Sequence, residues 1–78
     1  MMDSPRWKTY SYSEITKIAA DQIAFYMHAA RHSSGSKSLA RRETAYGVYM
    51  GWRALVGSYP DQAVYRSDDA RLEALLGA

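Results

Sequence analysis

The sequence contains no cysteine, and this absence excludes disulfide bonds and thiolate metal ligands as sources of stability. Its first residues lack a basic segment followed by an apolar run, so they do not predict a secretory signal. Its longest stretches without charge are far shorter than the ~18–20 apolar residues that cross a bilayer. We therefore expect a soluble, cytoplasmic protein with no membrane association.

Motifs that carry chemistry are also missing. The sequence has no Gly-rich phosphate loop, no local nucleophile–base motif and no constrained pair of carboxylates. His28 and His32 have the spacing of two metal ligands on one helix face, but Asp21 lies two turns before His28, too far along the helix to share their ion readily. We expect no catalytic residue, no metal site and no cofactor, and hence a protein that is not an enzyme.

The chain does contain helical periodicity. Ser11 and Glu14 fit a capping box at the start of a helix, and Gly57 is placed to end a later one. A domain of this size is only marginally stable. Because it has no disulfide bonds, helix packing or a partner must supply the additional stability. The sequence predicts a single all-α domain over residues 1–78, a small bundle whose three main helices span about 11–32, 39–56 and 67–76, with an extended N-terminal arm at 1–10 and a short helical turn near 60–65.

The spacing of apolar residues predicts which side of each helix is buried. Ser33 to Ser38 are expected to form a loop between the first two helices, and Ser67 is expected to cap the last one. The predicted core of the second helix is Ala45, Val48, Tyr49, Trp52, Leu55 and Val56. The first helix has a wider apolar sector of Ile15, Ile18, Ala19, Gln22, Ile23, Phe25, Tyr26, Ala29 and Ala30, and the last has Leu72, Leu75 and Leu76.

Tyrosine and tryptophan dominate the aromatic residues, since phenylalanine occurs only once. Such rings bury a large area while their polar group seeks a partner, which suits half-exposed interfaces. Almost opposite the core face of residues 39–56 lie Leu39, Tyr46 and Met50, flanked by Arg42 and Arg53. This composition is typical of interface hot spots. The same face could instead be covered by the arm and the last helix, and both alternatives remain open here.

A second candidate is a basic segment between the first two predicted helices. Arg31, Lys37, Arg41 and Arg42 fall within twelve residues that contain no acid, and with the neighbouring hydroxyls they could hold phosphates. Against this, the net charge is only +2, and a connection of about six residues is longer than the turn of a helix-turn-helix motif.

A third line on residues 39–56 is made of small side chains. Its members are Ala40, Gly47, Gly51 and Ala54. Each mid-helix glycine costs close to 1 kcal/mol relative to alanine, so two of them imply a compensating gain. The natural gain is the close approach of another backbone. We therefore expect a homodimer through Gly47 and Gly51.

Together these features favour a small protein-interaction module. Chains of this kind are often accessory proteins of phages or mobile elements, including inhibitors of host defence complexes. We expect an adaptor or inhibitor that occludes a surface of a larger protein or ribonucleoprotein complex through Leu39, Arg42, Tyr46, Met50 and Arg53. The alternative is a regulator that binds nucleic acid through residues 31–42.

Overall fold

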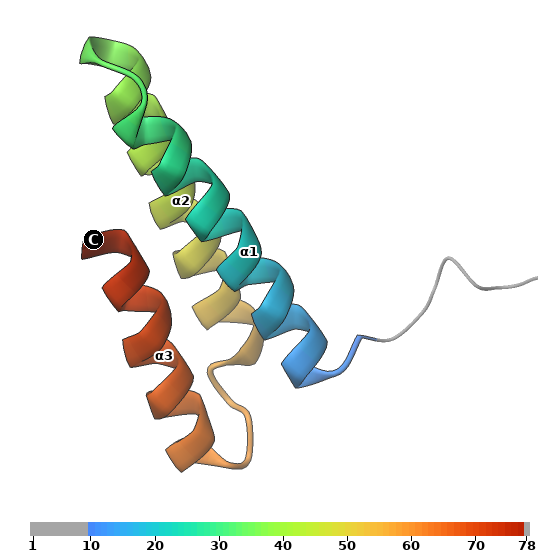
Figure 1. Cartoon of the computed structure of the whole chain (residues 1–78). Coiled ribbons are helices and arrows are strands. Elements are labelled where there is room, and N and C mark those ends of the chain that lie inside the picture. The colour runs from blue at the N-terminus through green and yellow to red at the C-terminus, as the bar shows by residue number, and fades with distance from the viewer. Residues whose placement is uncertain (1–9, 78) are drawn as a thin grey trace, which may run out of the picture.

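Residues 10–77 are described by the computed structural model, and they form three helices (Figure 1). These are α1 (Tyr12–Arg31), α2 (Gly35–Val56) and α3 (Gln62–Gly77). The first two run side by side as an antiparallel hairpin, and the shorter α3 lies beside them, ending near the middle of the hairpin in this view. The predicted all-α bundle is confirmed. Of the predicted arm, residues 1–9 lie outside the described residues, and Tyr10 is exposed and not helical.

The start of α1 matches its sequence prediction because the signal is local. The Ser11 Oγ accepts a hydrogen bond from the Glu14 backbone N–H at 3.1 Å, and the Glu14 carboxylate accepts one from the Ser11 backbone N–H at 2.8 Å. This reciprocal capping box satisfies two backbone donors at the helix N-terminus.

The predicted serine-rich loop at 33–38 is wrong in its extent, since α2 already begins at Gly35. Two of its serines cap α1 instead of extending the loop. The Ser33 hydroxyl donates to the Ala29 carbonyl at 2.8 Å, and the Ser38 hydroxyl donates to the Ala30 carbonyl at 3.0 Å. Gly35 has a φ of +61°, which a residue without a Cβ adopts at little cost. The chain therefore reverses within three residues rather than six.

A second correction concerns α3, which is one continuous helix rather than a short turn followed by a helix from Ser67. The cap is Asp61, whose carboxylate accepts from the Val64 backbone N–H at 3.1 Å. Ser67 lies inside the helix and is exposed. The Gln62 amide donates to the Gly57 carbonyl at 3.3 Å and also to the Tyr59 carbonyl, which fixes the link from α2.

The core lies mainly between α1 and α2, and α3 adds one buried residue to it. Its buried residues follow helical spacing and are Thr16, Ala19, Ile23, Met27 and Ala30 from α1, Ala45, Tyr49, Trp52 and Val56 from α2, and Leu72 from α3. The Trp52 indole N–H donates to the Thr16 hydroxyl at 2.9 Å, which gives the buried ring a partner for its polar atom. Trp52 also stacks on Tyr65 of α3, with ring centroids 5.3 Å apart.

Three residues predicted to be core are instead exposed: Ile18 to 47%, Phe25 to 66% and Leu55 to 73%. The apolar sector of α1 is wide, and α2 and α3 cover only part of it. Gln22, in the same sector, is exposed as well. Among the residues described, no helix combines the length and the apolar character that crossing a membrane requires.

Candidate functional site

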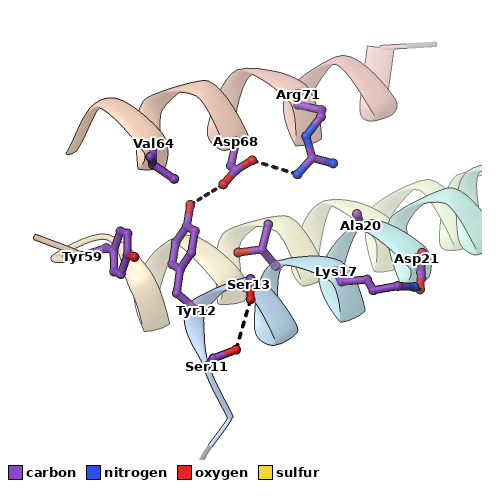
Figure 2. Close-up of a pocket in the computed structure, with 11 residues that line it drawn as sticks. Ser11, Tyr12, Ser13, Lys17, Ala20, Asp21, Tyr59, Val64, Asp68 and Arg71 are labelled. Atoms are coloured by element: carbon purple, nitrogen blue, oxygen red, sulfur yellow. Dashed lines mark hydrogen bonds and ion pairs between the residues drawn. The ribbon is translucent and has the colours of Figure 1, made fainter. Parts of the chain in front are cut away.

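A groove of about 630 Å³ lies between α1, Tyr59 and α3 (Figure 2). Tyr12 stacks on Tyr59 with ring centroids 4.0 Å apart, and its hydroxyl donates to the Asp68 carboxylate at 2.7 Å. The same carboxylate accepts from Arg71 at 2.8 Å. On the opposite wall Lys17 pairs with Asp21 at 2.8 Å. Each of these charges is thus neutralised by a neighbour.

The pKa values of Tyr12 and Asp68 indicate that these two groups have a structural role in the groove rather than a role in proton transfer. Burial, with the hydrogen bond to Asp68, raises the pKa of Tyr12 to about 12. Burial alone would raise the pKa of Asp68, but the hydrogen bonds from Arg71 and Tyr12 lower it below its ordinary value. A general acid or base works best with a pKa near the working pH, and neither group titrates there. The pair joins α1 to α3 as a fixed link.

The α2 edge, defined as Leu39, Arg42, Tyr46, Met50 and Arg53, lies on one side of a single helix because its members recur at helical spacing. Its three apolar residues are left uncovered by the described chain. Leu39 is 58% exposed, Tyr46 55% and Met50 41%. Of the two alternatives left open by the sequence, internal packing of this face is therefore not what the structure shows for residues 10–77.

Arg53 is the member of the α2 edge that is tied to the rest of the fold. Its Nε lies 3.6 Å from the Asp69 carboxylate and donates to the Tyr65 hydroxyl at 3.5 Å, both in α3. Its guanidinium carbon is 5.7 Å from the centre of the Tyr49 ring. Tyr49 in turn donates its hydroxyl to Asp69 at 2.7 Å. Arg53 is thus oriented by α3, whereas Arg42 and Tyr46 project from α2 without such ties among the described residues.

The basic tip, defined as Arg31, Lys37, Arg41 and Arg42, lies at the end of the hairpin where α1 turns into α2. The ion pairs found in residues 10–77 are Lys17–Asp21, Arg53–Asp69 and Arg71–Asp68, so none of them involves the tip. Arg41 donates to the Lys37 carbonyl at 3.5 Å. Because α2 starts earlier than predicted, Lys37, Arg41 and Arg42 all belong to one helix, with Arg42 turned by about 100° from Arg41. The cations therefore surround the tip rather than line one side.

The two histidines do lie together, with ring centroids 4.3 Å apart. The His32 Nδ1 is 2.9 Å from the His28 carbonyl oxygen, and this hydrogen bond engages one of its ring nitrogens. Within the part of the chain that the structure describes, no third histidine, cysteine or carboxylate joins them in a potential metal-binding group.

A further surface, which sequence reasoning found only in part through Gly47 and Gly51, is named here the outer face. It comprises Ile15, Ile18, Gln22 and Phe25 of α1 with Thr44, Gly47, Val48, Gly51 and Leu55 of α2. A shallow groove of about 250 Å³ runs along it, lined by residues of α1 and α2 alone. None of the members carries a formal charge. The absence of charge was visible in the sequence, but the periodicity placed the α1 members, Val48 and Leu55 in the buried apolar sectors, while Gly47 and Gly51 were expected to contact a second copy.

The small residues of α2 have no close neighbour within the described chain. A Cβ built on Gly47 or Gly51 meets no atom within 4 Å, and Ala40 and Ala54 are exposed. The expected close approach of another backbone is therefore not made by residues 10–77.

Comparison with protein-family models, curated proteins and solved structures finds no match to this chain.

Proposed function

We propose that this protein is a non-enzymatic interaction module whose α2 edge docks on a larger protein or ribonucleoprotein complex in the cytoplasm. It would act as an adaptor or inhibitor by covering a surface of that partner, in the manner of a phage-type accessory protein. The observation that carries the proposal is the exposure of Leu39, Tyr46 and Met50 between two arginines.

Each member has a role that follows from its position. Tyr46 offers a large ring with a polar end, and Met50 offers a flexible apolar chain that adapts to irregular surfaces. Arg53 contacts Asp69 and Tyr65 of α3, which restrict its side chain and reduce the freedom that it loses on contact. Arg42 at the rim adds charge that steers an acidic partner.

The test is capture of partners from native host extract on the immobilised full chain, with and without nuclease. Tyr46→Ala or Met50→Ala should weaken a nuclease-resistant partner at least about 10-fold, as loss of a hot spot does. Val64→Ala is the matched control, because Val64 of α3 is exposed to 42%, close to the 41% of Met50. Equal binding by all three variants would contradict the proposal.

A second candidate function rests on the basic tip, whose four cations make no ion pair with the described residues. Such cations are free to neutralise phosphates of a nucleic acid. On this alternative, the Arg41→Glu and Arg42→Glu double variant would abolish binding, affinity would fall steeply with salt, and Tyr46→Ala would have little effect. Loss of the captured material after nuclease treatment would favour it over the α2 edge.

A further inference from the structure

We propose that the outer face is the docking site for a second copy of this chain, joined through α1 and α2 to make a twofold dimer. This inference does not depend on the proposed function, because it uses a different surface of α2. It rests on the exposure, charge and shape of the outer face.

Exposure is the first observation. Ile18, Phe25 and Leu55 are 47%, 66% and 73% exposed, and Ile18 and Leu55 line the shallow groove between α1 and α2. Ile18 and Phe25 are seven residues apart on one side of α1, so they form a continuous apolar ridge. A contiguous apolar area of this kind on a small protein marks a contact surface.

Charge decides which occupant fits. All nine members of the outer face lack a formal charge, whereas α3 and the basic tip are rich in charged residues. A partner that brought charged side chains onto the outer face would bury them without a counter-ion, which is costly. A copy of the same face brings none. In a twofold interface the same patch meets itself, so an uncharged patch is complementary to its own copy.

Size limits the strength of the dimer. The outer face runs from Ile15 to Phe25 on α1, or roughly 15 Å, and two adjacent helices are roughly 20 Å wide. Such a surface has a footprint on the order of 300 Å² on each copy, or about 600 Å² in total, which is below the range for stable complexes. We therefore expect a weak dimer that forms at high protein concentration.

Shape supports the same arrangement. Gly47 and Gly51 make a low strip beside the ridge, and a Cβ on either would meet nothing within 4 Å in its own chain. A twofold partner can lay its ridge of Ile18 and Phe25 over this strip, which brings the two pairs of helices together as a four-helix arrangement. The free energy of this contact would compensate for the helix stability that the two glycines cost relative to alanine.

The test measures the mass of the full chain by light scattering and sedimentation as its concentration rises from the micromolar to the millimolar range. We expect the mass to approach twice the 8.8 kDa of one chain. Gly51→Glu places a charge in the centre of the outer face and should weaken association at least 10-fold, by about 1.4 kcal/mol or more. Ala70→Glu, at an exposed position of α3, is the matched control and should dimerise like the native chain.

Circular dichroism and the unfolding midpoint at low concentration establish that Gly51→Glu still folds, and Ile18→Glu provides a second break in the same surface. Since the chain has no cysteine, Gly51→Cys and Ala70→Cys can also be compared with a flexible bis-maleimide. Dimers should be captured by the first and not by the second. A monomer at all concentrations would overturn the proposal and leave the outer face to another partner. Equal association of the two glutamate variants, or equal cross-linking, would also overturn it.

Discussion

At the scale of single residues, two tyrosines hold α3 on the hairpin. Tyr12 of α1 donates to Asp68, and Tyr49 of α2 donates to Asp69, both at 2.7 Å. Neighbouring residues on a helix point about 100° apart, so the two carboxylates reach different helices of the hairpin. Hydrogen bonds to charged groups are among the stronger ones, and this pair fixes the rotation of α3 about its own axis.

These hydrogen bonds predict a loss of stability at alkaline pH. Burial and the bonds to Asp68 and Asp69 raise the pKa values of Tyr12 and Tyr49 to about 12, above the ordinary value of 10.0. A raised pKa means that the stabilisation is complete below pH 10 and is lost as the pH rises towards 12. In that window the free energy of unfolding should fall by up to about 1.4 kcal/mol per pH unit for each tyrosine.

Urea unfolding across this pH range measures the effect. Tyr12→Phe and Tyr49→Phe should each flatten the decline, because each removes one titrating group. Tyr46→Phe, a substitution on the α2 edge, is the control and should keep the native slope. The same slope in all three variants would show that these hydroxyls do not link pH to folding.

At the scale of helices, the sequence predicts what is encoded locally. The capping box of Ser11 and Glu14 places the start of α1 correctly, because both partners lie within one turn. The sequence did not predict that α2 begins at Gly35 or that α3 is one continuous helix. Ser33 and Ser38 look like loop residues until the chain folds back and their hydroxyls reach carbonyls of α1. Asp61 and Ser67 are both suitable caps by residue type, and the structure uses Asp61.

Two glycines, Gly47 within α2 and Gly57 at its C-cap, predict opposite effects of substitution by alanine. Gly47→Ala has open space around the new Cβ and a helical backbone, so it should raise the free energy of unfolding by about 0.5–1 kcal/mol. Gly57→Ala should lower it by more than about 1 kcal/mol, because its Cβ would lie 2.7 Å from the Arg53 carbonyl oxygen. Urea unfolding at low protein concentration, where the chain is a monomer, measures both. Destabilisation by Gly47→Ala there would mean that a contact within the chain needs this glycine.

At the scale of the whole molecule, the sequence predicts which residues can make contacts but not which surfaces stay open. The exposure of Tyr46 depends on α3 lying on the other side of the core, and that of Phe25 and Leu55 depends on the absence of a fourth helix among residues 10–77. Periodicity identifies an apolar side of a helix, but the number of available helices decides how much of it is covered. The α2 edge was therefore identified as a candidate, while Ile18, Phe25 and Leu55 of the outer face were mistaken for core.

The arrangement of the helices predicts that α3 opens before the hairpin does. In α3 only Leu72 is fully buried among the described residues, whereas α1 and α2 share most of the core (Figure 1). Regions with few buried apolar contacts open at lower free energy than the whole fold. Native-state hydrogen exchange should therefore show lower protection for the amides of α3 than for the central turns of α1 and α2.

Leu72→Ala sharpens this prediction, because it removes the side chain that anchors α3 in the core. It should cost about 2–5 kcal/mol, and exchange in α3 should accelerate more than in the hairpin. Leu39→Ala, at a 58% exposed position, is the control and should leave both rates within a few-fold of native. If Leu72→Ala accelerates exchange in all three helices equally, the molecule unfolds as one unit. The hairpin could not then persist, with its outer face intact, while α3 is detached.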